Sequence, residues 1–138
     1  MSLLSMSIAE LAREVQNGAV TAEAVAQESF VQIAASRALN AFLHVAEEPT
    51  LERARAIDER RRRGEALGPL AGVPVAIKDA LCTLDSPTTC ASKILSGWRS
   101  PYAATVVSRL AAADALLVGK TNMDEFAMGS SNETSAFG

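Results

Sequence analysis

Apolar residues in the first 64 positions recur every three to four residues, which is the spacing of amphipathic helices. The pattern predicts a first helix from Ser7 to Gly18, because Glu10 completes a capping box with Ser7 and Gly18 suits a left-handed stop. Its apolar face would comprise Ile8, Leu11, Ala12 and Val15. A second helix is expected from Thr21, with a stripe of Ala22, Val25, Ser29 and Ile33 and with Ala26 and Phe30 beside it. We interpret the pair as a helical hairpin that serves as scaffold.

A short strand is expected at 42–45, followed by a third helix that begins near Pro49 and closes with Arg60-Arg61-Arg62-Arg63-Gly64. Four arginines could form a phosphate-binding patch. Cations at a helix C-terminus also complement the helix dipole, and glycine is a common stop. Because no aromatic residues are interleaved and the chain is acidic overall, we favour a solvated helix end.

The pattern changes after position 65. An apolar run that starts at Val73 ends at Lys78 and is bounded by Gly72, which predicts a strand buried on both faces. A helix is expected from 103 to 113, with Val106, Val107, Leu110 and Ala111 facing inward, and then a second buried strand at 115–118. Strand, helix and strand in this order form a βαβ unit with parallel strands. The expected fold class is therefore α/β: a helical hairpin followed by βαβ units of a mixed, mainly parallel sheet covered by helices.

A chain of 138 residues is long enough for one domain with a real core. We assign residues 1–64 to a mostly helical scaffold and residues 65–138 to the start of the sheet. The last stretch changes from a short helical turn at 123–126 to a polar loop of Gly, Ser, Asn and Thr. A compact domain rarely ends in such a loop, so we expect the domain to continue beyond Gly138.

The composition is 49% hydrophobic and 21% charged, as in globular proteins. A net charge of -3 gives no global attraction to nucleic acid or to an anionic membrane. No apolar run approaches the ~20 residues that span a bilayer, and the first residues lack a signal-peptide pattern. We therefore expect a cytoplasmic protein that does not engage a membrane.

Cysteines and histidine are too few for a metal site, because Cys82, Cys90 and His44 supply no recognisable ligand spacing. We expect no metal and two reduced thiols. A catalytic triad with a histidine base would have to use His44, for which a structural or surface role is the better interpretation.

The candidate chemistry begins at Lys78, a charge at the end of a predicted buried strand. Ligand crevices in open α/β sheets form at the carboxyl ends of strands. Lysines are mostly exposed, however, so spacing and composition alone favour a lysine that simply emerges into solvent. Gly119-Lys120-Thr121 invites comparison with a phosphate-binding loop, but that motif needs a glycine five positions earlier, where this chain has Asp114.

Three long blocks follow one another in the second half of the chain: Leu70–Asp79, Thr88–Lys93 and Gly119–Ser131. Together they closely resemble the amidase signature family. The resemblance runs from about Ser7 to Gly138 and is dense from Leu70 onward. It implies that residues 1–138 are the N-terminal portion of a single amidase domain. Within the family, the chain most resembles the A subunits of the amidotransferases that convert Glu-tRNA(Gln) or Asp-tRNA(Asn).

The family uses a Ser–cis-Ser–Lys triad, and the resemblance places its lysine at Lys78. Both serines would lie in a Gly/Ser-rich signature beyond Gly138, so this chain alone is expected to be inactive. Burial disfavours the ammonium form of a lysine, which would let Lys78 act as the base. Asp79 would oppose this, but successive strand side chains point to opposite faces.

The resemblance also implies substrate-binding residues. Met128, Gly129 and Ser130 match the loop that lines the family's substrate pocket. Two departures from the family pattern are Ala80, where most such proteins carry asparagine, and the Asp85-Ser86 region, where a glycine is common. These departures would alter packing around Lys78 without removing it.

The resemblance implies a glutamine amidase that supplies ammonia to a transamidation reaction. Its partners would be the B and C subunits of the amidotransferase and, through them, aminoacyl-tRNA. The intact complex would use ATP and Mg²⁺, with no cofactor in this chain. Two alternatives remain open: a free-standing amidase of the same family that acts on another amide, and a non-catalytic interaction fragment.

Overall fold

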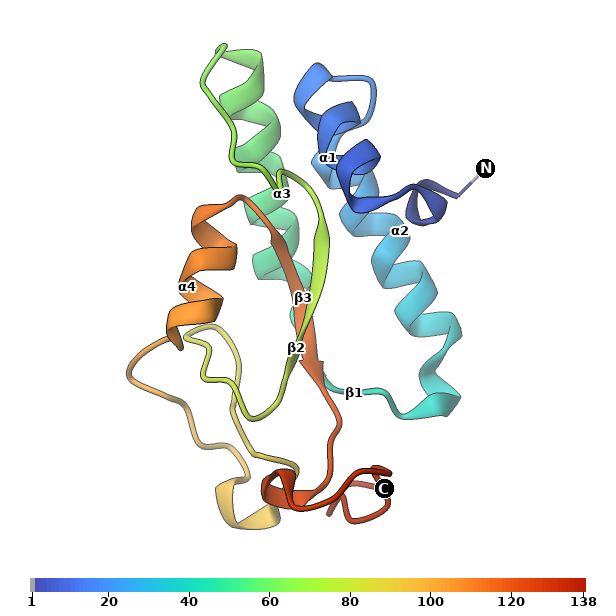
Figure 1. Cartoon of the computed structure of the whole chain (residues 1–138), viewed down its shortest axis with the longest axis vertical. Coiled ribbons are helices and arrows are strands. Elements are labelled where there is room, and N and C mark those ends of the chain that lie inside the picture. The colour runs from blue at the N-terminus through green and yellow to red at the C-terminus, as the bar shows by residue number, and fades with distance from the viewer. Residues whose placement is uncertain (1) are drawn as a thin grey trace.

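The segments with helical spacing form four α-helices in the computed structural model, which describes residues 2–138 (Figure 1). These are α1 (Ile8–Asn17), α2 (Ala22–Ala35), α3 (Glu47–Arg62) and α4 (Thr105–Ala112). The strands are β1 (Phe42–Val45), β2 (Pro74–Lys78) and β3 (Leu116–Thr121). Short 3₁₀ turns occupy 3–5, 37–39, 93–95 and 125–127.

The strands form one mixed sheet in the order β1-β3-β2. β2 and β3 are parallel and are joined through α4, so the predicted βαβ unit is confirmed. β1 runs antiparallel to β3 on its other side. The expected α/β fold class is therefore correct, and β3 continues to Thr121, three residues beyond the predicted end of this strand.

β2 differs from the prediction of a strand buried on both faces. Ile77 is buried, but Ala76 and Lys78 are exposed. β2 is an outer strand with β3 on one side only, and Pro74, which has no N–H to donate, suits its first position. The prediction was wrong because the face that carries Ala76 and Lys78 is open in this chain.

The local signals of the first helix are present as predicted. Ser7 Oγ accepts a hydrogen bond from the Glu10 amide at 3.3 Å, and the Glu10 carboxylate accepts one from the Ser7 amide at 3.0 Å. Gly18 ends the helix with φ at 81°. The capping box and the left-handed stop are thus both confirmed.

Two residues expected on inward faces are exposed instead. Ile8, the first residue of α1, is 63% exposed, and Val106 in α4 is 47% exposed. Val107 is the buried residue of α4, which shows that this helix contacts the core through a stripe narrower than its apolar pattern.

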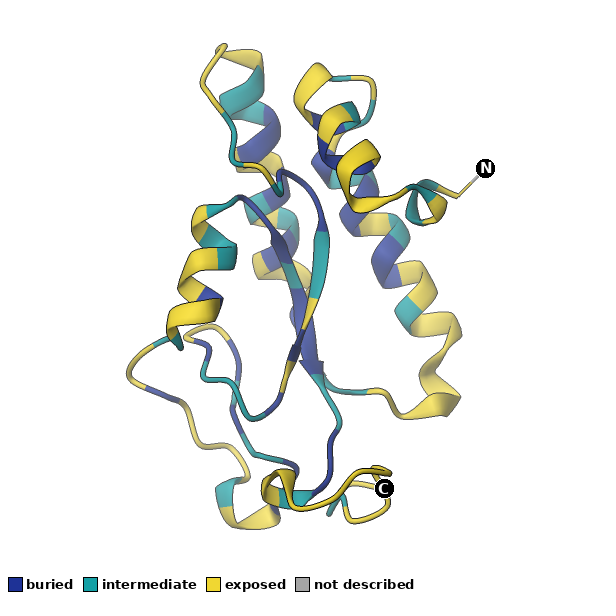
Figure 2. Cartoon of the chain, in the orientation of Figure 1, coloured by how far each residue is buried: buried dark blue, intermediate teal, exposed yellow. Residues whose placement is uncertain are grey.

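The main core lies where α1, α2 and α3 meet β3, and buried residues concentrate there in Figure 2. It contains Leu11, Val15, Ala22, Val25, Ala26, Phe30, Ala54, Ile57, Ala71, Leu116 and Val118. The small alanines let the backbones approach closely. Gly72, with φ at 74°, brings the chain into β2 so near α1 that a Cβ there would lie 2.8 Å from Val15 Cγ2. Only glycine fits this turn.

Asp58 joins α3 to the start of α2. Its buried carboxylate accepts hydrogen bonds from the amides of Ala22 at 2.9 Å and Glu23 at 3.1 Å. The first amides of a helix have no partner within it, and the helix dipole favours a negative charge there. Asp58 therefore supplements Thr21, whose side chain caps Ala24 from the preceding position.

Three of the four arginines at the end of α3, Arg60, Arg62 and Arg63, have acidic partners. Arg60 forms an ion pair with Asp114 at 2.7 Å, and Arg63 forms one with Glu65 at 2.7 Å. These contacts support the interpretation of a solvated helix end over that of a phosphate-binding patch. Among residues 2–138, no helix has the length and apolar character needed to cross a bilayer.

Replacing Asp58 with alanine should lower the free energy of unfolding of the chain by about 1–3 kcal/mol, because a buried and a partly buried amide at the start of α2 would lose their acceptor. Urea denaturation followed by circular dichroism measures the change. Glu52→Ala, at an exposed position on the same helix, is the matched control and should stay within about 0.5 kcal/mol of the original chain. Equal effects of the two substitutions would contradict the role of Asp58.

Candidate active site at the ends of β2 and β3

The two parallel strands end side by side, with Lys78 of β2 paired in register with Thr121 of β3. The segments that follow them, 79–101 and 122–138, gather at this end of the sheet, at the bottom of Figure 1. Such an edge is where open α/β sheets place their ligand crevices. Lys78, Met128, Gly129 and Ser130 all lie in the segments that end or follow these strands.

Lys78 and the next residue have opposite surroundings. The Lys78 side chain is exposed, and among the described residues it has no ion-pair partner. Asp79 is buried. This arrangement agrees with the alternation of strand side chains and places the two charges on opposite faces. The expectation that Lys78 lies on a dry strand end is not met in this chain, because its face of the outer strand is open.

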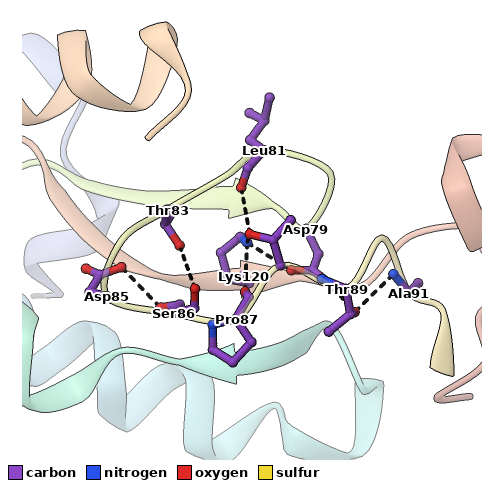
Figure 3. A network of polar contacts seen from close by, with 10 residues as sticks. Asp79, Leu81, Thr83, Asp85, Ser86, Pro87, Thr89, Ala91 and Lys120 are labelled. Carbon is purple, nitrogen blue, oxygen red and sulfur yellow. Dashed lines mark hydrogen bonds and ion pairs between the residues drawn. The ribbon is translucent and has the colours of Figure 1, made fainter. Parts of the chain in front are cut away.

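A second lysine at this end of the sheet is almost fully buried. Lys120, in β3, is 1% exposed, and its Nζ lies 2.9 Å from Asp79 Oδ1 (Figure 3). The ammonium group also donates to Thr88 Oγ1 at 2.8 Å and to the Pro87 carbonyl at 3.0 Å. Three acceptors thus satisfy its three N–H donors, as a buried ammonium requires.

The Asp79 carboxylate also shapes the loop that follows β2. Its Oδ2 accepts hydrogen bonds from the Thr89 amide at 3.0 Å and from the Thr89 hydroxyl. The loop from 79 to 89 is therefore closed by the same carboxylate that pairs with Lys120. Cys90 continues this closure, because its amide donates to the Asp79 carbonyl at 3.2 Å.

Gly119 explains how a lysine comes to point into the interior. The pairing with β2 shifts register just before Gly119, between Val75 and Ala76. The pairing with β1 shifts register just after it, between Phe42 and His44, opposite the step from Lys120 to Thr121. A Cβ at Gly119 would lie 2.3 Å from the His44 carbonyl oxygen, so only glycine allows this approach. Such irregularities re-aim the next side chain, which here is Lys120.

The sequence did not predict a role for Lys120, because Gly119-Lys120-Thr121 was compared only with a phosphate-binding loop, which it does not match. That rejection is supported: Lys120 lies inside β3 and is committed to Asp79. The usable signal was a Gly-Lys pair that directly follows a buried apolar run, with an aspartate after the neighbouring strand.

The two loops are tied to each other as well as to the strands. The Phe126 amide donates to the Cys90 carbonyl at 2.9 Å, and the Ala136 amide donates to the Ala91 carbonyl at 3.0 Å. Ser92 Oγ donates to Glu125 Oε1 at 2.6 Å. Met128, Gly129 and Ser130 project from this tied segment and are exposed.

Other candidate chemistry at this end of the sheet is weak. Burial, followed by the nearby Asp79 carboxylate, raises the pKa of the Cys90 thiol, which opposes formation of a nucleophilic thiolate. His44 lines a groove of about 310 Å³ together with Asp79 and Thr89. Among residues 2–138, no group of three or more potential side-chain ligands is arranged to hold a metal ion.

The family assignment follows from comparison with known proteins. A family model described as Amidase matches residues 24–138. The chain belongs to the amidase family.

Individual relatives agree with this assignment. The chain is 57% identical to the A subunit of the glutamyl-tRNA(Gln) amidotransferase of Rhodopirellula baltica over 133 residues, which are 96% of this chain and 27% of that protein. A solved structure described as a vestigial protein complex that reveals the evolutionary origins of an s-triazine catabolic enzyme matches with a TM-score of 0.91. The two sequences are 38% identical, and the match covers 96% of this chain and 30% of the chain in that structure.

The peptide amidase of Stenotrophomonas maltophilia matches with a TM-score of 0.84 and 31% identity, over 94% of this chain and 27% of that one. The chain thus spans between a quarter and a third of the length of the proteins it matches.

Replacing Lys120 with methionine should lower the free energy of unfolding by about 3–5 kcal/mol, because Asp79 would remain buried without its counter-charge. Denaturant unfolding of the 138-residue chain measures the loss. The double variant Lys120→Met/Asp79→Leu should lose less than the sum of the single variants, since no charge is left unpaired.

The matched control is Lys78→Met, which makes the same substitution at the end of the neighbouring strand. Because Lys78 is exposed, its replacement should change the free energy of unfolding by no more than about 0.5 kcal/mol. Similar losses for both lysines would contradict the distinction between a buried, paired lysine and an open one.

Proposed function

We propose that this chain is the N-terminal portion of a glutamine amidase, the component that supplies ammonia within a tRNA-dependent amidotransferase. The main support for this proposal is the 57% identity with the A subunit of a glutamyl-tRNA(Gln) amidotransferase along 96% of the chain. On this proposal, residues 1–138 belong to one amidase domain that acts in the cytoplasm, where its aminoacyl-tRNA is found. Residues 1–64 form its helical scaffold and 65–138 begin its catalytic sheet.

In the complete protein, Lys78 acts as the general base of a Ser–cis-Ser–Lys triad whose serines lie in the Gly/Ser-rich signature of the family. The position of Lys78 at the carboxyl end of β2 supports this role. Its exposed face is where the remainder of the domain would pack. That packing would remove the amine from water and disfavour its ammonium form.

The pairing of Asp79 with Lys120 supports the same assignment. A free carboxylate next to Lys78 would favour the charged ammonium and so oppose a basic role. The Asp79 charge is instead directed to the opposite face and balanced by Lys120 at 2.9 Å. Lys78 is thereby separated from the nearest acidic side chain in the sequence.

The proposed reaction follows from these roles. Lys78 takes a proton, through the bridging serine, from the serine that attacks the glutamine carboxamide. Collapse of the adduct breaks the C–N bond, and the departing nitrogen takes a proton to leave as ammonia. Water then attacks the acyl-enzyme and releases glutamate, which restores the free serine. Met128, Gly129 and Ser130 would contact the glutamine.

The partners would be the B and C subunits, through which ammonia reaches aminoacyl-tRNA. ATP and Mg²⁺ serve the intact complex on this proposal. Within residues 2–138 the only sequence with a likeness to a phosphate-binding loop lies in β3, where Lys120 is already paired. Lys120 is therefore not free to contact a phosphate group, and the steps proposed for the residues of this chain do not use ATP.

A free-standing amidase is the second candidate, because the fold also matches the peptide amidase of Stenotrophomonas maltophilia at a TM-score of 0.84. The complete protein should release ammonia from glutamine with a higher kcat/KM than from C-terminal peptide amides. The reverse order of kcat/KM values would favour the free-standing amidase.

Replacing Lys78 with alanine in the complete protein should reduce ammonia release from glutamine by roughly 10²–10⁴-fold, because the general base would be lost. Lys78→Arg should be equally impaired, since a guanidinium does not give up its proton. The exposed Lys93→Ala is the control and should keep the original rate. A Lys78→Ala enzyme near the original rate would refute the assignment.

The 138-residue chain alone should release no ammonia from glutamine, because the proposed serines lie outside it. A coupled assay with glutamate dehydrogenase measures ammonia directly. Release that Lys78→Ala abolishes would contradict this expectation.

A further inference from the structure

Asp124 occupies a position that the proposed reaction does not use. It follows β3 by three residues and is 6% exposed. Oδ2 accepts hydrogen bonds from the amides of Ser131 at 3.1 Å and Asn132 at 2.9 Å. Oδ1 accepts from the Thr134 amide at 3.1 Å and from its hydroxyl at 2.9 Å. One carboxylate thus gathers four donors from the segment that follows Ser130.

Gly129 lies directly against this carboxylate. A Cβ at Gly129 would come within 2.5 Å of Asp124 Cγ and 2.7 Å of both carboxylate oxygens. The backbone of the loop therefore folds over Asp124 so closely that no side chain fits between them. The conformation at Gly129 and the bonds to residues 131–134 are two independent signs that the loop is wrapped around this carboxylate.

The start of the loop is held in an unfavourable conformation. Phe126 and Ala127 have φ values of 52° and 60°. These values lie in the left-handed region of backbone conformation, which residues other than glycine and asparagine rarely adopt. The Phe126 amide is fixed by the Cys90 carbonyl at 2.9 Å. Two sharp turns followed by the wrap around Asp124 leave Met128 projecting outward, 81% exposed.

We propose that Asp124 is the positioning residue of the amide-binding loop, and that its carboxylate fixes Met128, Gly129 and Ser130 in the conformation that receives the substrate. The proposal rests on the proposed function, which assigns substrate contact to these three residues. Asp124 itself would not touch the substrate and would act only through the loop.

The chemistry of the site calls for a carboxylate. All four groups that face Asp124 are donors, and an ionised carboxylate is an acceptor at both oxygens. An asparagine would satisfy the Thr134 side but would turn an NH₂ group toward two amide N–H groups. In agreement, the hydrogen bonds from the Asn132 and Thr134 amides lower the pKa of the Asp124 carboxyl. The loop should therefore keep its order throughout the neutral pH range and lose it only in acid, as the pH falls through the lowered pKa of Asp124.

The test uses Asp124→Asn in the complete protein. KM for glutamine should rise about tenfold or more while kcat changes by less than about threefold, because binding geometry is lost and the Lys78 chemistry is retained. Inactivation by a fluorophosphonate, a small reagent for activated serines, should stay within about twofold of the original rate. Hydrogen exchange in 131–134 should accelerate. Glu133→Gln, which removes an exposed carboxylate from the same loop, should leave KM unchanged.

A second variant tests the same proposal if the Asp124→Asn protein does not fold. Gly129→Ala retains the carboxylate but places a methyl group against it, and should raise KM in the same way. Shortening Asp124 to serine makes room for that methyl group, so Asp124→Ser/Gly129→Ala should have a KM no higher than Asp124→Ser alone. An additive rise in KM would overturn the proposal.

The outcomes separate the two proposals. If Lys78→Ala keeps its activity, the proposed function fails whatever Asp124→Asn does. If Lys78→Ala is inactive and Asp124→Asn has the original KM, only the positioning role fails. Parallel losses of kcat, fluorophosphonate reactivity and melting temperature in both Asp124→Asn and Gly129→Ala would also overturn it, because they would indicate general destabilisation.

Discussion

The ion pair between Asp79 and Lys120 joins the ends of the two parallel strands at a point closed to water. Burying two charges is costly, and the cost is offset only when the remaining donors and acceptors are also satisfied. Here Thr88, Pro87 and Thr89 complete that set. The loop after β2 therefore has its conformation fixed from inside, through the same carboxylate that neutralises the lysine.

A similar arrangement recurs after β3, where Asp124 holds the loop that contains Gly129. Each of the two parallel strands, β2 and β3, is thus followed by a buried aspartate that organises the chain beyond it. Backbone bonds between the two loops, such as the one from Phe126 to Cys90, link the two units. The end of the sheet is consequently a rigid polar platform, with Lys78 at the end of its outer strand. Such rigidity is what a site needs if its reacting groups are to be held in place.

The parts of the fold that sequence predicts well are those with local causes. The capping box at Ser7, the stop at Gly18 and the start of the second helix at Thr21 depend on residues a few positions apart, and all are present. The general tendency of lysine to be exposed gave the correct expectation for Lys78 itself. The open face of β2 that carries Ala76 and Lys78 could not be predicted from local sequence, because it depends on the place of β2 in the strand order. The burial of Lys120 depends on a close approach at Gly119 between strands more than 70 positions apart in sequence.

The register shifts at Gly119 have a further consequence for how the sheet assembles. The pairing of β3 is irregular with β2 just before Gly119 and with β1 just after it. The close contact at Gly119 is made by β1, so β1 cannot slide along β3 without losing it. A slip of β2 by one residue would turn Lys78 toward Lys120 and bring two ammonium groups together, while Asp79 would face outward. The buried pair therefore favours the observed register over one that is shifted by one residue, because the shifted alignment would separate the opposite charges.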